Sequence, residues 1–255
     1  MRNFRSHAPQ HRLDRDTLHP PLRRLTEIIV QDTVRRILTA RVYDVAEETP
    51  LDPLKRLSAR IGRPALLKRE DLQPVFSFKI RGAYNRIAAL TQAELARGVI
   101  CASAGNHAQG VALAAAKRGA AATIVMPTTT PGIKVAAVQG LGGQVVLHGE
   151  SFDDAYAHAR ALEKQTGAAF VHPFDDPDVI AGQGTVGLEI LRQHPDPIDA
   201  VFIPIGGGGL AAGVAAIVRF LRPETRLIGV EPAEAPTMKS AIEAGRVVDL
   251  DQVGL

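Results

Sequence analysis

From about residue 65 onward, short apolar runs alternate with longer stretches in which apolar residues recur at helical spacing. Runs that are apolar, short and bounded by turn residues are typical of buried strands. They occur at residues 98–101, 122–126, 144–147, 169–172, 200–205 and 226–230. Because strands and helices alternate, the sequence predicts an α/β fold in which helices wrap a parallel sheet.

The clearest helical pattern covers residues 151–165. Ser151 stands where a helix cap is expected, and Asp154 follows at the spacing of a capping box. Apolar residues then recur at helical spacing and a glycine closes the pattern, at Phe152, Ala155, Ala159, Leu162 and Gly167. Two more helices are expected at residues 28–39 and 210–220.

No repeat, low-complexity tract or linker divides the chain, so any second lobe must interleave with the first. Residues 1–45 form an arginine-rich arm. This arm also carries acidic residues and almost no aromatic residue that can stack on bases. We therefore expect a solvated arm that closes into a helix, and no nucleic-acid partner.

Composition narrows the class of protein. Of 255 residues, 45% are apolar, which suits one large soluble unit or two lobes that share a cleft. The net charge is only +3, and the single cysteine, Cys101, can form neither a disulfide framework nor a metal cluster. No apolar run approaches the roughly 20 residues of a membrane helix. These observations favour a cytoplasmic chain without a membrane partner.

A metal site is not expected either. The histidines that stand within the α/β pattern are dispersed without the spacing of metal ligands, at His107, His148, His158 and His172. Core or surface roles account for them.

Three segments with candidate chemistry lie where a strand or extended run ends and a helix begins, which is where ligands bind in open α/β sheets. The first contains Lys79, which follows Phe78 in a turn of small residues. An amine attacks an aldehyde only when partial burial or nearby cations keep it neutral part of the time. A lysine at a helix start is usually just solvated, so the assignment of Lys79 depends on its context.

The second segment is residues 103–110, just after the predicted strand that ends at Cys101. Ser103 is a candidate helix cap. The free amides of a helix start attract anions such as a carboxylate, and the Asn106 side chain can donate to a phenolate oxygen. Capping and ligand binding are compatible, so both interpretations stay open.

The third segment is a run of glycines that ends in an apolar helix, at Gly206, Gly207, Gly208, Gly209 and Leu210. Consecutive glycines are costly in chain entropy, so something should need their bare backbone. A phosphate monoester is cradled by several N–H groups that no Cβ obstructs, and the positive end of a helix dipole favours it. The run predicts a phosphate seat, with a merely flexible turn as the alternative.

Residues 182–187 match the G-x-G-x-x-G spacing of dinucleotide-binding folds. The match follows a predicted helix start instead of a strand. The acidic residue further on, Asp199, precedes the next strand, where the fingerprint requires an acid at the strand's end. We therefore interpret the match as a coincidence of spacing.

Taken together and in this order, the three segments resemble the fold-type II pyridoxal 5′-phosphate (PLP) enzymes, and most closely the biosynthetic threonine ammonia-lyases (threonine dehydratases). The resemblance runs from about Ile37 to the C-terminus. Its motifs lie at residues 49–51, 68–71, 77–84, 103–110, 126–127, 172–175, 182–185 and 206–209. The run at residues 68–75, Lys-Arg-Glu-Asp-Leu-Gln-Pro-Val, is more similar to the biosynthetic threonine enzymes than to serine racemases.

The resemblance implies a role for each candidate residue. Lys79 forms a Schiff base with PLP and, once freed, removes the Cα proton of the substrate. Phe78 packs on the cofactor ring, Asn106 hydrogen-bonds the ring oxygen, and the glycine run with Leu210 holds the phosphate. The substrate carboxylate is expected at Ser103, Ala104, Gly105 and His107.

The implied reaction is deamination of L-threonine to 2-oxobutanoate and ammonia, the first step of isoleucine biosynthesis, with L-serine as a slower substrate. The alternatives are a related fold-type II reaction, such as serine dehydration, serine racemisation or threonine synthesis, and a catalytically incomplete fragment. Full-length relatives form homotetramers, so a homo-oligomer is expected.

The implied architecture has two parallel-sheet-based, three-layer lobes with PLP in the cleft between them. Residues 1–45 are the arm and first helix, residues 46–84 and 166–255 the large PLP lobe, and residues 85–165 the small substrate lobe. Family members continue past the region that matches residues 253–255, into elements that include a partner for the pyridine nitrogen and a regulatory domain. We therefore expect a large lobe that is incomplete at the C-terminus.

Overall fold

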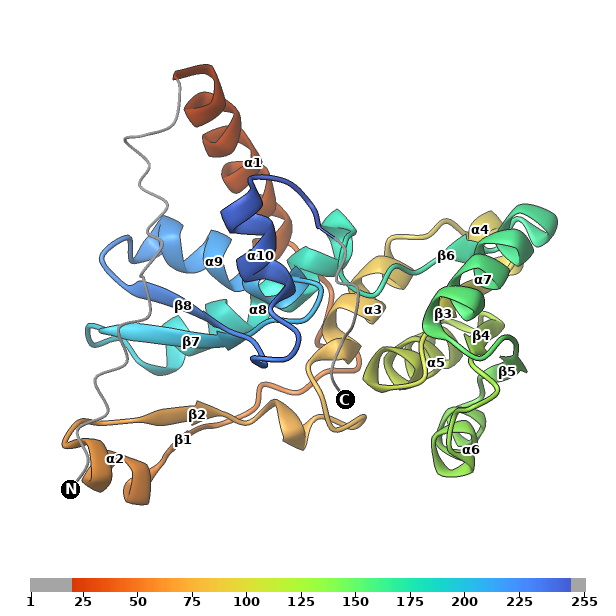
Figure 1. Cartoon of the computed structure of the whole chain (residues 1–255), viewed down its shortest axis with the longest axis horizontal. Helices are drawn as coiled ribbons and strands as arrows, with labels where there is room; N and C mark the ends of the chain where they lie inside the picture. Colours follow the sequence, from red (N-terminus) through yellow and green to blue (C-terminus); the bar gives the residue numbers. More distant parts are fainter. Residues whose placement is uncertain (1–19, 249–255) are drawn as a thin grey trace.

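The computed structural model describes the backbone of residues 20–248 and the side chains of residues 27–248. A four-stranded parallel sheet of order β5-β4-β3-β6 forms one end of the molecule (Figure 1). Val99 pairs with Ala122 between β3 and β4, and with Ala169 between β3 and β6. The strands are β3 (Val99–Ala102), β4 (Ala122–Met126), β5 (Gln144–Leu147) and β6 (Ala169–Phe170).

Helices cover both faces of this sheet because successive strand residues point to opposite faces. Cys101 packs with α5 on one face, in the first core, whereas its neighbour Ile100 packs with α7 on the other face. This part of the chain is therefore a three-layer α/β arrangement, as predicted. Its helices are α4 (Gln92–Ala96), α5 (Asn106–Arg118), α6 (Gly132–Gly140) and α7 (Phe152–Thr166).

The predicted capping box of α7 is confirmed. The Ser151 hydroxyl accepts a hydrogen bond from the Asp154 amide at 3.1 Å, and the Asp154 carboxylate accepts one from the Ser151 amide at 3.1 Å. Gly167 ends the helix with a φ of +69°, a left-handed conformation that favours glycine. The helix therefore begins and ends where the sequence places its signals.

A second core joins three helices to a two-stranded parallel sheet, with Ala200 of β7 paired to Arg226 of β8. Ile203 of β7 and Ile217 of α9 are buried in it. The elements are α1 (Pro20–Leu38), α8 (Pro177–Gln193), β7 (Ala200–Pro204), α9 (Gly209–Leu221) and β8 (Arg226–Val230), followed by α10 (Thr237–Ala244).

The prediction of buried strands is wrong for β7 and β8, and also for the edge strand β5, whose Leu147 is 48% exposed. Phe202 is 66% exposed and Val230 is 49% exposed, whereas Val201 and Ile203 face the second core. Successive side chains of a strand point to opposite faces of a sheet. Because the second core lies on one face of this sheet, alternate residues of its strands face solvent.

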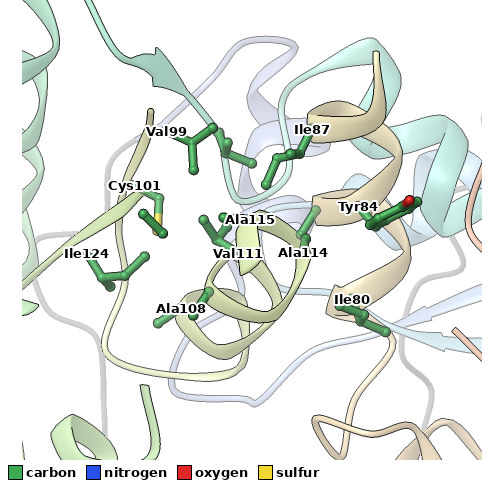
Figure 2. Packing of buried hydrophobic residues seen from close by; sticks show 14 of the residues in the cluster. Ile80, Tyr84, Ile87, Val99, Cys101, Ala108, Val111, Ala114, Ala115 and Ile124 are labelled. Carbon is green, nitrogen blue, oxygen red and sulfur yellow. The ribbon is translucent and has the colours of Figure 1, made fainter. Parts of the chain in front are cut away.

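α3 (Lys79–Ala88) lies between the two cores (Figure 1). Figure 2 shows Ile80, Tyr84 and Ile87 of this helix gathered with Val111 of α5 and Cys101 of β3. On its other side α3 approaches α8. The bounds of the remaining elements are β1 (Leu51–Pro53), α2 (Lys55–Ile61), β2 (Leu66–Lys68) and the short 3-10 helix Glu70–Leu72, with β1 antiparallel to β2.

The glycines of the G-x-G-x-x-G match lie inside α8. A Cβ on Gly182 would lie 2.6 Å from the Arg81 carbonyl oxygen of α3, and a Cβ on Gly187 would lie 2.7 Å from Ile217 of α9. A Cβ on Gly184 would lie 2.4 Å from Ile37 of α1. These glycines let three helices approach the backbone of α8, and they form no strand-to-helix turn of the kind that a dinucleotide requires.

The predicted lobe boundaries at residues 84 and 165 do not coincide with the ends of structural elements. α3 continues past residue 84, and β6 lies beyond residue 165 although it pairs with β3. The four-stranded sheet therefore reaches Phe170, and the chain then crosses to α8 (Figure 1).

Candidate functional site

Lys79 is the first residue of α3, and its side chain is half-buried. Nζ donates a hydrogen bond to the Pro173 carbonyl at 2.6 Å, and it lies 5.6 Å from the centroid of the Phe78 ring. Burial lowers the pKa of Lys79 to about 8 from its ordinary value of 10.5. About a tenth of such amines are neutral at pH 7, against roughly 0.03% for an ordinary lysine.

The turn that leads into α3 has two unusual features. Phe76 has a φ of +56°, in the left-handed region that non-glycine residues rarely adopt, and its side chain is 76% exposed. Ser77 is buried, and its hydroxyl has no hydrogen-bond partner among the described atoms. Phe78 packs against the second core, together with Leu210. The backbone is therefore held in a costly conformation just before Lys79.

The start of α5 lies at the end of β3 and has no side-chain cap. The predicted cap at Ser103 is wrong: the structure places the N-cap at Gly105, and the Ser103 hydroxyl accepts a hydrogen bond from the Gly105 amide at 3.2 Å. Asn106 begins the helix with its side chain exposed. The first amides of a helix have no carbonyl of their own helix to bond, so they are available to an anion between Ala104 and His107.

His107 is buried beneath this helix start. Its Nε2 donates to the Val171 carbonyl at 2.9 Å, while Nδ1 has no partner among the described atoms. Burial, together with the positive charge of Lys79, lowers the pKa of His107 to about 3. The imidazole is therefore neutral over the physiological range and fixes the helix start to the chain after β6.

The glycine run lies between β7 and α9, as predicted. Gly208 has a φ of +89°, which favours glycine. A Cβ on Gly207 would lie 2.1 Å from the Phe174 ring, and one on Gly209 would lie 2.7 Å from the Phe174 carbonyl oxygen. A Cβ on Gly206 would meet nothing within 4 Å. The loop is thus a bare-backbone cradle at the positive end of α9.

One short segment contacts all three junctions. Residues 171–175 accept from Lys79 at Pro173 and from His107 at Val171, and they place Phe174 against Gly207. No role was predicted for this segment, although its His-Pro-Phe-Asp motif contributed to the resemblance. Because Pro173 and Phe174 are adjacent, the amine of Lys79 and the glycine cradle border the same stretch of backbone.

A buried charged cluster surrounds Arg81, two residues after Lys79, and it was not predicted from the sequence. Arg81 donates to both carboxylate oxygens of Glu189, at 2.5 and 2.9 Å, and to Glu70 at 2.7 Å. Lys68 lies 2.6 Å from Glu189, and the Tyr43 hydroxyl donates to Glu189 at 2.8 Å. The two cations and the two carboxylates of the cluster neutralise one another. Because they come from different elements, the cluster joins α3 to α8 and to the β1–β2 hairpin. Its only sequence signal was the charged run at residues 68–71.

Burial acts to lower the pKa of Arg81, but the hydrogen bonds that Arg81 donates to Glu70 and Glu189 outweigh it and hold this pKa above its usual value. Burial and the Glu189 carboxylate raise the pKa of Tyr43 to about 12. Arg81 therefore stays charged and Tyr43 stays protonated at neutral pH.

The residues at the three junctions fit PLP. The cofactor's aldehyde requires an amine that is neutral often enough to attack, and Lys79 is such an amine. Its phosphate requires backbone amides that no Cβ obstructs, and the glycine run supplies them: the space beside Gly206 is open, whereas Phe174 occupies the space beside Gly207 and Gly209. Asn106 has an exposed side chain that is free to donate to a ring oxygen.

The described residues provide neither a metal site nor a membrane-spanning helix. Residues 27–248 contain no group of three or more histidine, cysteine or acidic side chains arranged to hold a metal ion. Among the described helices, none is both long and apolar enough to cross a membrane. Cys101, the single cysteine, is buried in the first core.

Comparison with curated proteins finds close relatives. The chain is 60% identical over 227 residues to a biosynthetic L-threonine dehydratase of Burkholderia multivorans, covering 88% of this chain and 45% of that protein. It is 54% identical over 222 residues to the biosynthetic L-threonine dehydratase of Escherichia coli, covering 87% and 43%. The chain thus spans less than half the length of these relatives.

Solved structures give the same result. The processed form of threonine deaminase isoform 2 from Solanum lycopersicum superposes with a TM-score of 0.86 at 53% identity, covering 88% of this chain and 62% of that one. Maize serine racemase superposes with a TM-score of 0.83 at 36% identity, covering 88% and 67%. The family described as pyridoxal-phosphate dependent enzyme matches residues 42–253. By sequence and by fold alike, this chain belongs to the pyridoxal-phosphate dependent enzyme family.

Proposed function

We propose that this chain carries the catalytic residues of a PLP-dependent threonine ammonia-lyase, which converts L-threonine to 2-oxobutanoate and ammonia. The observation that carries the proposal is the half-buried Lys79 amine, held at 2.6 Å from the Pro173 carbonyl with a pKa of about 8. Relatives named threonine dehydratase are 52–60% identical to it over the matched residues. Because the chain spans 45% of the first of these, the activity is proposed for the protein to which these residues belong.

Lys79 has two tasks in the proposed reaction. Its neutral amine would hold the cofactor through the cofactor's aldehyde carbon, and Nζ, when not so bonded, would take the Cα proton of the substrate. A base works best when its pKa lies close to the operating pH, which burial achieves here. PLP, when bound, supplies the electron sink for the carbanion that this proton transfer leaves.

The remaining predicted residues bind and orient. The amides at the start of α5, with the Ser103 hydroxyl, would hold the substrate carboxylate along Ala104, Gly105 and His107. Asn106 would donate to the cofactor's ring oxygen, and Phe78 would pack on its ring. The amides of the glycine run and Leu210 would hold the phosphate at the positive end of α9.

Reductive trapping tests the cofactor assignment. The chain is incubated with PLP, reduced with borohydride, digested and analysed by mass spectrometry. We expect a pyridoxyl adduct on Lys79 that is absent from Lys79→Ala. Lys117→Ala, at an exposed lysine of α5, is the matched control and should keep the adduct. An adduct spread over surface lysines, with none on Lys79, would overturn the assignment.

Product analysis separates the two reactions that the comparisons favour. Threonine should give 2-oxobutanoate, detected by its hydrazone, with serine as a slower substrate. Maize serine racemase is also similar to the chain, so D-serine is measured in the same samples. D-serine without ketoacid would assign racemisation instead, and an adduct on Lys79 without either product would identify a catalytically incomplete piece.

We further propose a role in isoleucine biosynthesis, a cytoplasmic setting and assembly as a homo-oligomer, a tetramer by analogy with the family. The lobes are proposed as residues 46–84 with 166–255, which would hold the cofactor, and residues 85–165, which would hold the substrate. The pairing of β6 with β3 supports moving the second boundary from residue 165 to about residue 170. Light scattering of the purified protein measures its subunit number.

A further inference from the structure

His172 stands at the centre of the segment that contacts all three junctions. Its Nδ1 accepts a hydrogen bond from the Asp175 amide at 2.7 Å and a longer one from the Phe174 amide at 3.3 Å. An imidazole nitrogen that accepts cannot carry a proton, so the ring is neutral with its hydrogen on Nε2. The side chain thereby closes a tight turn over residues 172–175.

This turn presents two groups to the site. The Pro173 carbonyl accepts from the Lys79 amine at 2.6 Å. Phe174 lies so close to the glycine loop that a Cβ on Gly207 would come within 2.1 Å of its ring. The His172 and Phe174 rings also pack edge to face, with centroids 4.7 Å apart. A change in the turn must therefore move both the partner of the amine and the wall of the phosphate cradle.

We propose that His172 is a positioning residue, whose neutral Nδ1 holds the turn that fixes Lys79 and the glycine loop relative to one another. The inference rests on the proposed function, because it concerns the two groups that would bind the ends of the cofactor. His172 acts through Pro173 and Phe174 and takes no part in proton transfer to the substrate.

The surroundings of His172 keep it neutral near physiological pH. Burial lowers its pKa below the ordinary 6.5, Asp175 and Asp176 of the same connection oppose this change, and the cations Arg160 and Lys79 add to it. The other titratable groups near the ring are the phenol of Tyr156 on α7, 6.4 Å away between centroids, and the imidazole of His107 on α5. Protonation of Nδ1 at lower pH would remove the acceptor for both amides.

Two variants and a control separate the acceptor from the bulk of the side chain. His172→Asn keeps a side-chain oxygen that can accept from amides two and three residues further on, as asparagine does in turns. His172→Leu keeps the volume and removes the acceptor. His158→Leu, at a half-buried histidine of α7 that stacks on His148, is the matched control.

The first measurement needs no cofactor. Hydrogen exchange of the Phe174 and Asp175 amides is followed in the 255-residue chain as a function of pH, after correction for intrinsic exchange. In the wild type, protection of both amides should fall as the pH drops below 6.5, and His172→Asn should lose this step while keeping the protection at pH 7. His172→Leu should exchange at least tenfold faster at pH 7, and His158→Leu as the wild type.

The second measurement reports on Lys79. Competitive acetylation at a series of pH values gives the apparent pKa of its amine, again without PLP. His172→Leu should raise this pKa from about 8 toward 10.5, because an open turn admits water to the amine, whereas His172→Asn should leave it near 8. The dissociation constant for PLP, measured from Schiff-base absorbance, should rise at least tenfold in His172→Leu and less than threefold in His172→Asn.

Unchanged amide protection in His172→Leu, or an unchanged Lys79 pKa, would overturn the inference. So would His172→Asn behaving as His172→Leu does, because the role would then not be that of an acceptor. If His172→Leu does not fold, the wild-type pH profile and His172→Asn decide. Absence of a PLP adduct on wild-type Lys79 would instead refute the proposed function, and the exchange and acetylation data remain a separate test of the turn.

Discussion

Lys79 is a cation that its surroundings disfavour. The folded chain releases the Lys79 proton near pH 8, whereas the unfolded chain holds it up to the ordinary pKa of 10.5. Between these values the unfolded state binds more protons, so stability rises with pH across this window. Below pH 8 the folded chain bears the full cost of burying the charge. The residue that makes the site reactive therefore weakens the fold.

Replacing Lys79 by methionine is expected to raise the free energy of unfolding at pH 7 by up to about 3 kcal/mol. The gain should shrink as the pH rises from about 8 to 10.5, because the wild-type amine then loses its charge. Urea unfolding of both chains at several pH values measures it. Lys117→Met, at an exposed position, serves as the control and should change little at any pH. A gain that does not vary with pH would contradict this origin.

The candidate site residues could be predicted from the sequence because each stands next to the start of a predicted helix. Lys79, Asn106 and the glycine run each stand at a strand-to-helix or loop-to-helix junction, as expected. The low pKa of Lys79 was not predictable in detail, because it arises from burial, and the segment at Pro173 that contacts the amine lies 94 positions away in the chain. The left-handed conformation of Phe76 was not predicted either, because phenylalanine has no preference for a positive φ.

At the scale of elements, the junction between β7 and α9 depends on the absence of side chains. A Cβ added at Gly207 would overlap the Phe174 ring, whereas one at Gly206 would meet open space. Gly206 lies outside the left-handed region, so alanine there strains nothing. These two neighbouring glycines differ in what a single methyl group would disturb.

Gly207→Ala is expected to lower the free energy of unfolding by about 1–3 kcal/mol, because Phe174 must move. Gly206→Ala should leave it within roughly 0.5 kcal/mol of the wild type. Chemical denaturation without cofactor compares them. If Gly206 belongs to the phosphate seat, its alanine variant should nevertheless weaken PLP binding. Equal destabilisation by the two alanines would show that the Phe174 contact does not distinguish them.

Elements were predicted well where local signals decide. The bounds of β4, β5 and β8 coincide with the apolar runs, and α7 lies between its predicted cap and glycine. The cap of α5 was misplaced because Ser103 and Gly105 both suit that position, and the path of the chain after β3 selects the glycine. The exposure of Phe202 in β7 was missed because an apolar run does not reveal how many faces of a sheet are covered.

On the scale of the whole molecule, the buried cluster around Arg81 and Glu189 joins segments that are far apart in the chain. Both side chains are fully buried, and Glu189 also faces Lys68 and Tyr43. Removing one partner of such a pair leaves a charge without compensation in a medium of low dielectric constant. The cluster thus makes the position of α3, and with it Lys79, depend on α8.

Glu189→Ala is expected to destabilise the chain by about 3–5 kcal/mol, since Arg81 and Lys68 lose a shared carboxylate. Lys239→Ala, which removes the exposed pair with Glu243, should cost less than roughly 1 kcal/mol. Thermal or urea unfolding gives both values. A small effect of Glu189→Ala would mean that Glu70 alone compensates Arg81.

The fold class and its parallel sheets were predictable because alternation of strand and helix constrains topology. The meeting of distant segments was not. The sequence showed three junctions, but not that residues 171–175 contact all of them. These contacts use the backbone carbonyls of Val171 and Pro173, and every residue type carries such a carbonyl, so the residue types do not reveal them.

The contacts of residues 171–175 also restrict how many residues can lie between β6 and α8. One residue inserted between β6 and α8 would displace the partners of Lys79, His107 and Gly207 in a single step, whereas an insertion in the turn after α5, near Gly119, would leave all of them in place. The number of residues between β6 and α8 is therefore constrained. Natural variants of this chain should tolerate substitution there far more readily than insertion or deletion.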